Sequence, residues 1–372
     1  MKAAHVTGCR VGRAGAACGS RLARLLILAA VLASALPLAD AGAARAAAPE
    51  PLPLSGVATW AYQIQGLERS GAVVALRDAG YDMLVVEPTR TQRGSGGFDT
   101  AAMVASLKSG LTADGVHRPL VLAYISVGEA ESWRWYWTWS RAWHGGRPRP
   151  ADWPSFIAAR DPDGWDGCYP VAVWKKRWKD IAIYGRQTGA APGREYTSIL
   201  DETIRDGFDG VYLDWVAAYE EPAVRRMARA DGVSARGETM EFLRELRDAA
   251  EIRAPGFLIV QQNAGDLRRG RPGLFGIVDG IAQEGVWYYG EATDSWSDPR
   301  GHDVATPASW RRDYLLDLAA FRSAGLPVFC CEYTSAHAAR TYARAASRGF
   351  ACYCTRAALS RLTGTPPASL AR

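Results

Sequence analysis

The chain of 372 residues lacks several features that would assign it to a well-known class. No block of Lys and Arg occurs and the net charge of +5 is modest, so nothing in the composition suggests nucleic acid as a partner. The five His are scattered, and none has a metal-ligand spacing with a Cys. We therefore expect no metal and no other cofactor. Beyond the first 48 residues, no apolar run is long enough to cross a bilayer.

The N-terminal segment has the pattern of a secretory signal. Arginines precede the apolar run 25–39, and small residues with A-x-A cleavage sites follow it. The run is short for a membrane span and contains Pro37, although a retained anchor is the alternative. No Cys ends the run, which argues against a lipoprotein, and no twin-arginine pair precedes it. We expect residues 1–48 to be a signal peptide with a short linker, and residues 49–372 to be a single secreted or periplasmic domain.

Few cysteines remain after the signal. They are Cys168, Cys330, Cys331, Cys352 and Cys354. Export makes a disulfide plausible, and two of these pairs fall on predicted strands that would be neighbours in a barrel, so a bridge between the strands is geometrically possible. The other interpretation is that these side chains are small buried hydrophobic groups on core strands. An odd total leaves at least one thiol unpaired.

Short apolar runs alternate with amphipathic helical patterns from Val57 onwards. Strands are expected at 57–66, 81–89, 117–131, Val211–Leu213, 256–263, 275–288, 326–334 and 350–355, and helices at 70–80, 98–110, 197–207, 237–256, 306–325 and 335–349. Eight such units predict an α/β fold, a (β/α)8 TIM barrel with a Trp-rich insertion after strand 3. A doubly wound open sheet is the alternative, but it usually has fewer strands, and the first βα turn lacks a phosphate-binding glycine loop.

Polar and aromatic residues end the predicted strands, where barrel enzymes carry catalytic groups. An Asp after a strand is often only a helix cap, but carboxylates end five of the eight strands here. Paired carboxylates beside aromatic faces are what glycoside hydrolysis needs. Asp214, in a polar mouth, is expected to be the ionised nucleophile. Glu284, beside Val286 and Trp287, is expected to be the desolvated acid/base with a raised pKa.

The remaining residues at the strand ends are candidates for binding a glycan. They are Tyr62, Glu87, Tyr124, Glu129, Glu131, Trp133, Trp215, Gln262, Asn263, Trp287 and Tyr333. The segment 132–146 holds five Trp, which either line a glycan cleft or cover the rim of the barrel by packing. Trp133 and Trp137 lie nearest the Glu129–Glu131 turn and are the best cleft candidates among them.

Several motifs together resemble glycoside hydrolase family 114. They are YISVGEAESWRWYW (124–137), Val173-Trp174-x3-Trp178, GFDGVYLDW (207–215), the Gln-Asn end of strand five and the QEG around Glu284. The resemblance covers residues 57–356 and is to the exported prokaryotic branch, labelled endo-α-1,4-polygalactosaminidase. It implies a (β/α)8 barrel that cleaves an α-1,4-galactosamine polymer with retention of configuration, and it places the two catalytic acids at Asp214 and Glu284.

Two features bear on the substrate. The run GEAE after YIS differs from the fungal polygalactosaminidases. A galactosamine polymer is cationic, and strand-end acids would give it an acidic mouth on a mildly basic protein; these are Glu87, Glu129, Glu131, Glu220, Glu221 and Glu332. Alternatively, some of them pair with Arg90, Arg134 or Arg356 and only hold loops.

Two functions other than hydrolysis are compatible with the same residues. A non-catalytic glycan-binding barrel would keep the aromatic and acidic cleft, and a scaffold whose barrel mouth is buried in a partner is a weaker alternative. The chain has neither the HIGH nor the KMSKS signature, which rules out the cysteinyl-tRNA synthetase label sometimes given to related proteins.

Overall fold

Eight parallel strands form the centre of the protein in the computed structural model, which describes residues 49–140, 143, 148–185 and 198–371. In sheet order they are β1 (Trp60–Gln63), β2 (Met83–Val86), β3 (Leu120–Ser126), β6 (Gly210–Asp214), β7 (Leu258–Gln262), β8 (Gly280–Glu284), β11 (Val328–Tyr333) and β12 (Ala351–Thr355). Each predicted strand is present, and the predicted barrel is confirmed. The predicted signal peptide lies outside the described residues.

The first and last strands come together and nearly close the barrel. The indole Nε1 of Trp60 on β1 donates to the carbonyl of Ala351 on β12 over 3.3 Å. Beyond the two strands, the backbone N–H of Ile64 donates to the carbonyl of Leu359 over 3.0 Å. Closure matters for function because it brings all eight carboxyl ends to one face.

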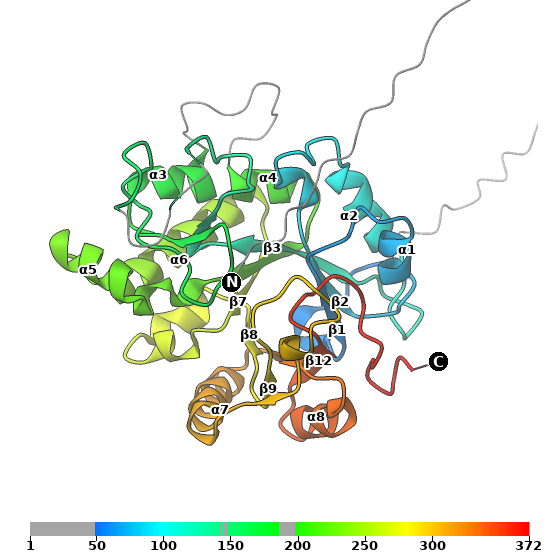
Figure 1. Cartoon of the computed structure of the whole chain (residues 1–372). Coiled ribbons are helices and arrows are strands. Elements are labelled where there is room, and N and C mark those ends of the chain that lie inside the picture. The colour runs from blue at the N-terminus through cyan, green and yellow to red at the C-terminus, as the bar shows by residue number, and fades with distance from the viewer. Residues whose placement is uncertain (1–48, 141–142, 144–147, 186–197, 372) are drawn as a thin grey trace, which may run out of the picture. The chain divides into compact units, whose positions relative to one another are not determined.

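Helices surround the strands, as Figure 1 shows. They are α1 (Ala72–Arg77), α2 (Thr100–Lys108), α3 (Lys176–Lys179), α4 (Ile199–Arg205), α5 (Pro222–Ala230), α6 (Ala235–Arg253), α7 (Ala308–Ser323) and α8 (Ala338–Ala346). Side chains of Asp99, Ser198 and Ser234 accept backbone N–H groups at the starts of α2, α4 and α6. Every helix predicted from the sequence is found, whereas the short α3 and α5, which opens on Pro222, were not predicted.

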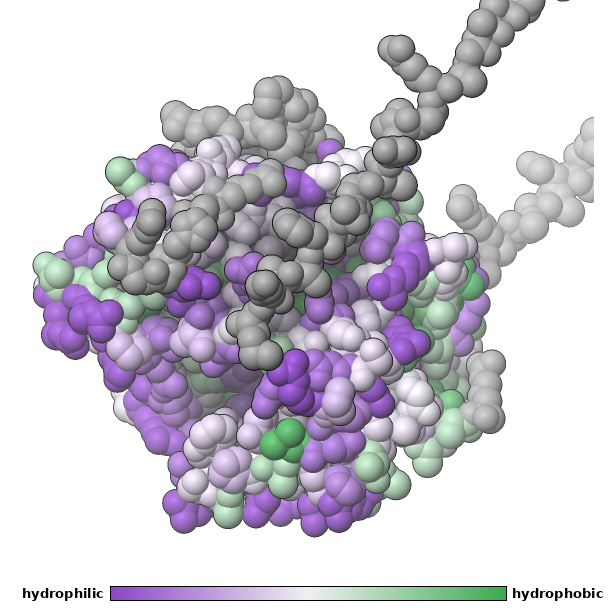
Figure 2. All heavy atoms as spheres, viewed as in Figure 1, coloured by the Kyte–Doolittle hydropathy of each residue, from purple (hydrophilic) through white to green (hydrophobic). Residues whose placement is uncertain are grey.

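The surface of the described residues is mainly polar. In the view of Figure 2, hydrophilic residues dominate and hydrophobic ones form small separated patches. Within the described ranges, no helix combines the length and apolar character that a bilayer crossing requires.

Aromatic rings fill the interior of the barrel. The ring of Trp60 on β1 lies 6.0 Å from the rings of Tyr212 on β6 and Phe329 on β11. Neither β6 nor β11 neighbours β1 in the sheet, so these contacts cross the interior. Because side chains alternate along a strand, Asp214 shares the inner face with Tyr212.

The register carries the same alternation to Glu284. Tyr212 is paired with Val260 and Gln262 with Ala282, so Gln262 and Glu284 also face inwards. Gln261, Gln283 and Glu332 have the opposite parity and face outwards. This alternation decides which polar residues at the strand ends reach the mouth.

The Trp-rich insertion packs its aromatic rings against one another and joins the hydrophobic core of the barrel. Within it, β4 (Glu129–Glu131) pairs antiparallel with β5 (Cys168–Pro170). Trp137 stacks on Tyr169 with ring centroids 5.1 Å apart and meets Trp153 edge-on at 4.9 Å. Trp137 is only 1% exposed, so its prediction as a cleft residue was wrong. The neighbouring rings bury it; Trp133, by contrast, is partly exposed.

The cysteines in the described part of the chain are buried and form no disulfide. Cys330 on β11 lies opposite Cys352 on β12, and both thiols point away from the barrel interior. Their interpretation as small hydrophobic groups on core strands is therefore confirmed, and the possible bridge is absent.

Candidate active site

Asp214 ends β6 on the inner face of the barrel and is held by two neutral donors. The hydroxyl of Tyr124 donates to its Oδ2 over 2.7 Å, and the backbone N–H of Trp215 donates to its Oδ1 over 2.7 Å. Trp215 adopts a left-handed conformation, with φ of 58°, which turns the chain sharply after the strand. The carboxylate is fixed in position while part of it stays open to solvent.

The glycine of the YISVGEAE motif is required by this sharp turn. A methyl group on Gly128 would come within 1.8 Å of the carbonyl oxygen of Trp215. In addition, the backbone N–H of Val127 donates to the carbonyl of Asp214 over 3.0 Å. The motif after β3 and the turn after β6 therefore pack backbone against backbone, which only a glycine permits.

Glu284 ends β8 and is also held by neutral donors. The hydroxyl of Tyr333 donates to its Oε1, and the side-chain amide of Asn263 donates to its Oε2 over 3.3 Å. The oxygen of the same amide accepts the backbone N–H of Glu284 over 3.0 Å. Asn263 thus holds both the backbone and the side chain of Glu284.

The two carboxyls are electrostatic neighbours. Burial, followed by the negative charge of Glu284, raises the pKa of Asp214 to about 7. Burial likewise raises the pKa of Glu284, while hydrogen bonds from Tyr333, Asn263 and Gln262 oppose that rise. The expectation of a raised pKa for Glu284 agrees with this. The expectation that Asp214, in a polar mouth, is the readily ionised member does not, because burial raises its pKa as well.

The turn that carries Asn263 is strained and braced from outside the barrel. Asn263 and Ala264 both have positive φ, at 54° and 52°. The amide of Gln261, which is fully buried, donates to the carbonyls of Asn263 and Ala264 over 2.8 and 3.0 Å. Gln261 was not predicted as a functional residue. The signal that could have identified its supporting role is a polar side chain next to Gln262 that alternation directs away from the barrel interior.

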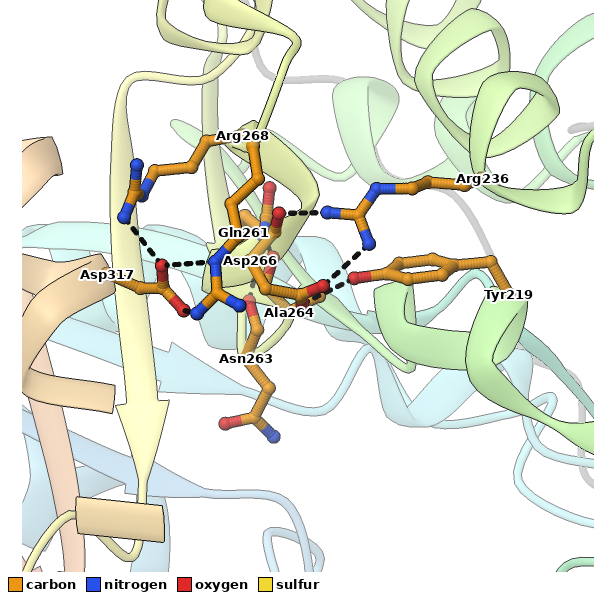
Figure 3. A network of polar contacts seen from close by, with 9 residues as sticks. Tyr219, Arg236, Gln261, Asn263, Ala264, Asp266, Arg268 and Asp317 are labelled. Atoms are coloured by element: carbon orange, nitrogen blue, oxygen red, sulfur yellow. Dashed lines mark hydrogen bonds and ion pairs between the residues drawn. The ribbon is translucent and has the colours of Figure 1, made fainter. Parts of the chain in front are cut away.

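A polar network continues from this turn, as Figure 3 shows. The hydroxyl of Tyr219 and the guanidinium of Arg236 each donate to Asp266 over 2.6 Å. Arg268 donates to Asp317 on α7 over 2.7 Å. These contacts attach the turn to α6 and α7, so the position of Glu284 is supported by the surrounding helices.

Two predicted binding residues are already engaged in a buried ion cluster. Arg134 is 4% exposed and pairs with Glu87 and with Glu131, each of which is 3% exposed. Its guanidinium also donates to Thr91 over 2.5 Å. Glu87 and Glu131 therefore tie the insertion to the loop after β2, as the alternative interpretation of the strand-end acids held.

Glu129 lies in a different environment. It is 2% exposed, and burial together with nearby Asp161 and Asp214 raises its pKa well above the usual range. Asp161 reaches it from the insertion, where its own Oδ1 accepts the backbone N–H groups of Gly164 and Trp165. The structure places Glu129 near Asp214 without a cationic partner among the described residues.

Glu332 serves the backbone. Its carboxylate accepts the N–H groups of Val286, Trp287 and Tyr288 over 3.0, 2.9 and 2.8 Å. Burial raises its pKa to about 8. Because Glu332 faces outwards on β11, its prediction as part of an acidic mouth was wrong, and it holds the loop after β8 instead.

The other predicted residues divide by exposure. Tyr62 and Gln262 face inwards, are 1% and 2% exposed, and line the floor below the acids. Trp287 is 4% exposed and lies beneath Arg348, 5.7 Å from the guanidinium carbon, so its ring is covered. Glu220 is exposed and Glu221 partly so, at the rim. Arg356 donates to the carbonyl of Trp296 over 2.6 Å.

Comparison with known proteins decides the family. A family model described as glycoside-hydrolase family GH114 matches residues 40–368. The chain belongs to this family. This glycoside hydrolase is 29% identical over 364 residues to an uncharacterized protein of Deinococcus radiodurans. The match covers 93% of this chain and 99% of that one. The resemblance drawn from the motifs is confirmed.

The fold of this glycoside hydrolase is also found in a solved structure with a TM-score above 0.5. The glycoside hydrolase domain of PelA from Pseudomonas aeruginosa matches with a TM-score of 0.55 and 17% identity, over 83% of this chain and 99% of that domain. A complex of Ega3 from Aspergillus fumigatus with galactosamine matches with a TM-score of 0.49 and 16% identity, over 83% of this chain and 95% of that one.

Proposed function

We propose that this glycoside hydrolase is an exported enzyme that cleaves an α-1,4-galactosamine-type exopolysaccharide by a retaining mechanism with two carboxylates. The observation that carries the proposal is the pair Asp214 and Glu284. Both end inward-facing strands, both are held by neutral donors, and each lies within the electrostatic reach of the other. No other pair of strand-end acids in the described part of the chain combines these features.

The roles follow from the chemistry of retention. Asp214 attacks the anomeric carbon while Glu284 gives a proton to the leaving oxygen, and a glycosyl-enzyme ester forms on Asp214. Glu284, now ionised, takes a proton from water, and the water cleaves the ester. The coupled pair suits this sequence because mutual repulsion in a desolvated site keeps one proton on the pair near neutral pH.

The substrate class rests on charge and on the family resemblance. Asp214, Glu284 and Glu129 lie together at one end of the barrel. Arg134 forms ion pairs with Glu87 and Glu131 and does not offset the charge of those three. A cationic amino sugar would offset the repulsion among the first three carboxyls. A neutral glycan would leave that repulsion uncompensated.

The test is cleavage of galactosamine polymers of defined deacetylation, with other microbial exopolysaccharides beside them. We expect the wild-type protein to release oligosaccharides whose new reducing end first appears as the α-anomer by NMR. Asp214→Asn and Glu284→Gln should each lower the rate at least about a thousand-fold. Glu220→Gln, a change of the same kind at the exposed rim, should stay within a few-fold of wild type.

Three results would contradict parts of the proposal. Cleavage that survives both substitutions would remove the mechanism. Initial release of the β-anomer would replace retention by inversion. Binding of a glycan with no cleavage of any polymer would favour the non-catalytic barrel.

A further inference from the structure

We propose that Tyr289, Trp310 and Tyr314 form an aromatic platform that stacks against a sugar ring of the polymer, outside the site of cleavage and next to Glu284. The inference rests on the proposed function and extends it to a distal binding subsite. None of the three residues was predicted from the sequence as a site residue.

Tyr289 connects the platform to the catalytic pair. It lies on β9 (Tyr288–Tyr289), a short strand that follows β8 by a tight turn. Gly285 comes directly after Glu284, and a methyl group on Gly285 would lie 3.0 Å from the Cβ of Tyr289. Tyr289 therefore stands against the backbone that carries Glu284.

Trp310 and Tyr314 extend the aromatic surface along α7. Their spacing of four residues places them on one face of the helix, and Trp310 lies in its first turn. The ring of Trp310 is 6.4 Å from that of Tyr289. Burial and the negative charges of Glu220 and Glu284 raise the pKa of Tyr314, so both carboxylates act on it electrostatically.

Exposure separates Trp310 from the other large aromatics. Its side chain is 52% exposed, whereas Trp137 and Trp178 in the insertion are 1% and 0% exposed. An exposed indole at the edge of a catalytic cleft forgoes most of the free energy of burial. A bound sugar restores that burial, and an ammonium group above the indole adds a cation–π attraction.

The platform is rigid before any ligand arrives. Glu332 binds the backbone N–H groups from Val286 to Tyr288, and Thr306 donates its hydroxyl to the carbonyl of Gly285 over 2.7 Å. Strand β10 (Val304–Ala305) pairs with β9, with Val304 opposite Tyr289. Tyr289 on this fixed hairpin, and Trp310 and Tyr314 on the helix α7, therefore lose little backbone entropy when they bind.

The experiment compares Trp310→Ala with wild type on long galactosamine polymer and on oligomers too short to reach beyond the catalytic pair. We expect KM for the polymer to rise roughly three- to thirty-fold, with kcat and the kinetics on short oligomers unchanged. Trp310→Phe should restore most of the loss. Leu316→Ala, an exposed apolar residue on another face of α7, serves as the matched control and should behave as wild type.

Two outcomes decide against the platform. Unchanged KM for the polymer in Trp310→Ala would overturn it, as would an equal loss on short oligomers. If the wild type cleaves no galactosamine polymer, the proposed function fails separately. The platform is then judged by titrating Glu284→Gln with a polysaccharide panel: affinity lost on adding Trp310→Ala supports it, and no binding of any polysaccharide overturns it.

Discussion

Two groups of strand-end carboxylates show how the same residue type serves opposite purposes. Glu87 and Glu131 lie on the β2–β4 side and share the guanidinium of Arg134. Asp214 and Glu284 lie on the β6–β8 side and accept from uncharged donors, which are Tyr hydroxyls, side-chain amides and a backbone N–H. The shared cation offsets part of the charge of the first pair and commits both carboxylates to structure. The two carboxylates of the second pair still repel each other, and a bound proton or a cationic substrate would relieve that repulsion.

The difference shows that a position at the end of a strand does not determine the function of a carboxylate. The groups that pair with the carboxylate determine it. Glu332 is a third case, in which three backbone N–H groups occupy the oxygens. A carboxylate whose oxygens are filled by charged or fixed donors has little left for a substrate. Substitutions in one group at a time should therefore have different effects on stability and activity.

The largest effect on stability is expected from Arg134→Met. The substitution leaves Glu87 and Glu131 buried without their counter-charge, and we expect the free energy of unfolding to fall by about 3–5 kcal/mol. Urea denaturation measures it. The control Arg77→Met removes a surface ion pair with Asp78 and should leave the stability close to that of wild type. Adding Glu87→Gln and Glu131→Gln to Arg134→Met should recover part of the loss; a triple variant no more stable than Arg134→Met would contradict the buried-charge explanation.

A smaller effect of opposite sign is expected from Asp214→Asn. The ordinary pKa of an Asp carboxyl is about 3.9, and burial with Glu284 nearby raises that of Asp214 to about 7. The folded state therefore binds this proton more tightly than the unfolded state. The resulting stability is complete below about pH 4 and is lost as the pH rises towards 7.

Removing the titrating group should remove this loss. We expect Asp214→Asn to unfold like wild type at pH 4 and to be about 1–3 kcal/mol more stable at pH 8. Denaturation at both pH values tests it, with Asp313→Asn, an exposed change of the same kind, as control. A variant destabilised at pH 8 would place Asp214 with the structural carboxylates.

The smallest effects concern the turn that holds Glu284. Ala264→Gly relieves a left-handed conformation, and we expect about 0.5–1 kcal/mol of added stability with unchanged activity. Asn263→Ala, one residue earlier, removes both contacts with Glu284 and should lower kcat about ten-fold with a shifted pH profile. Equal kinetics for the two variants would show that Asn263 does not position the acid.

Much of the fold was readable from local pattern. The alternation of apolar runs with helical periods predicted each strand and most helices, because strand and helix patterns depend on residues close in sequence. Helix α5 was missed: three of its nine residues are Arg, and only Val224 and Ala228 are buried, so its apolar stripe is short. The insertion was read less well, because Trp137 packs on Tyr169 and Trp153, which lie far along the chain.

By itself, the sequence determined the order of the eight strands and the presence of Asp214 and Glu284 near the carboxyl ends of two of them, because these follow from hydrophobic periodicity and short motifs. Only the tertiary structure decided which acids are spent on Arg134 or on backbone N–H groups, and which aromatic rings remain exposed. The physical reason is that solvation and counter-charge are set by neighbours brought together in space. The solvation and the counter-charge of a carboxylate are set only when the barrel has folded around it.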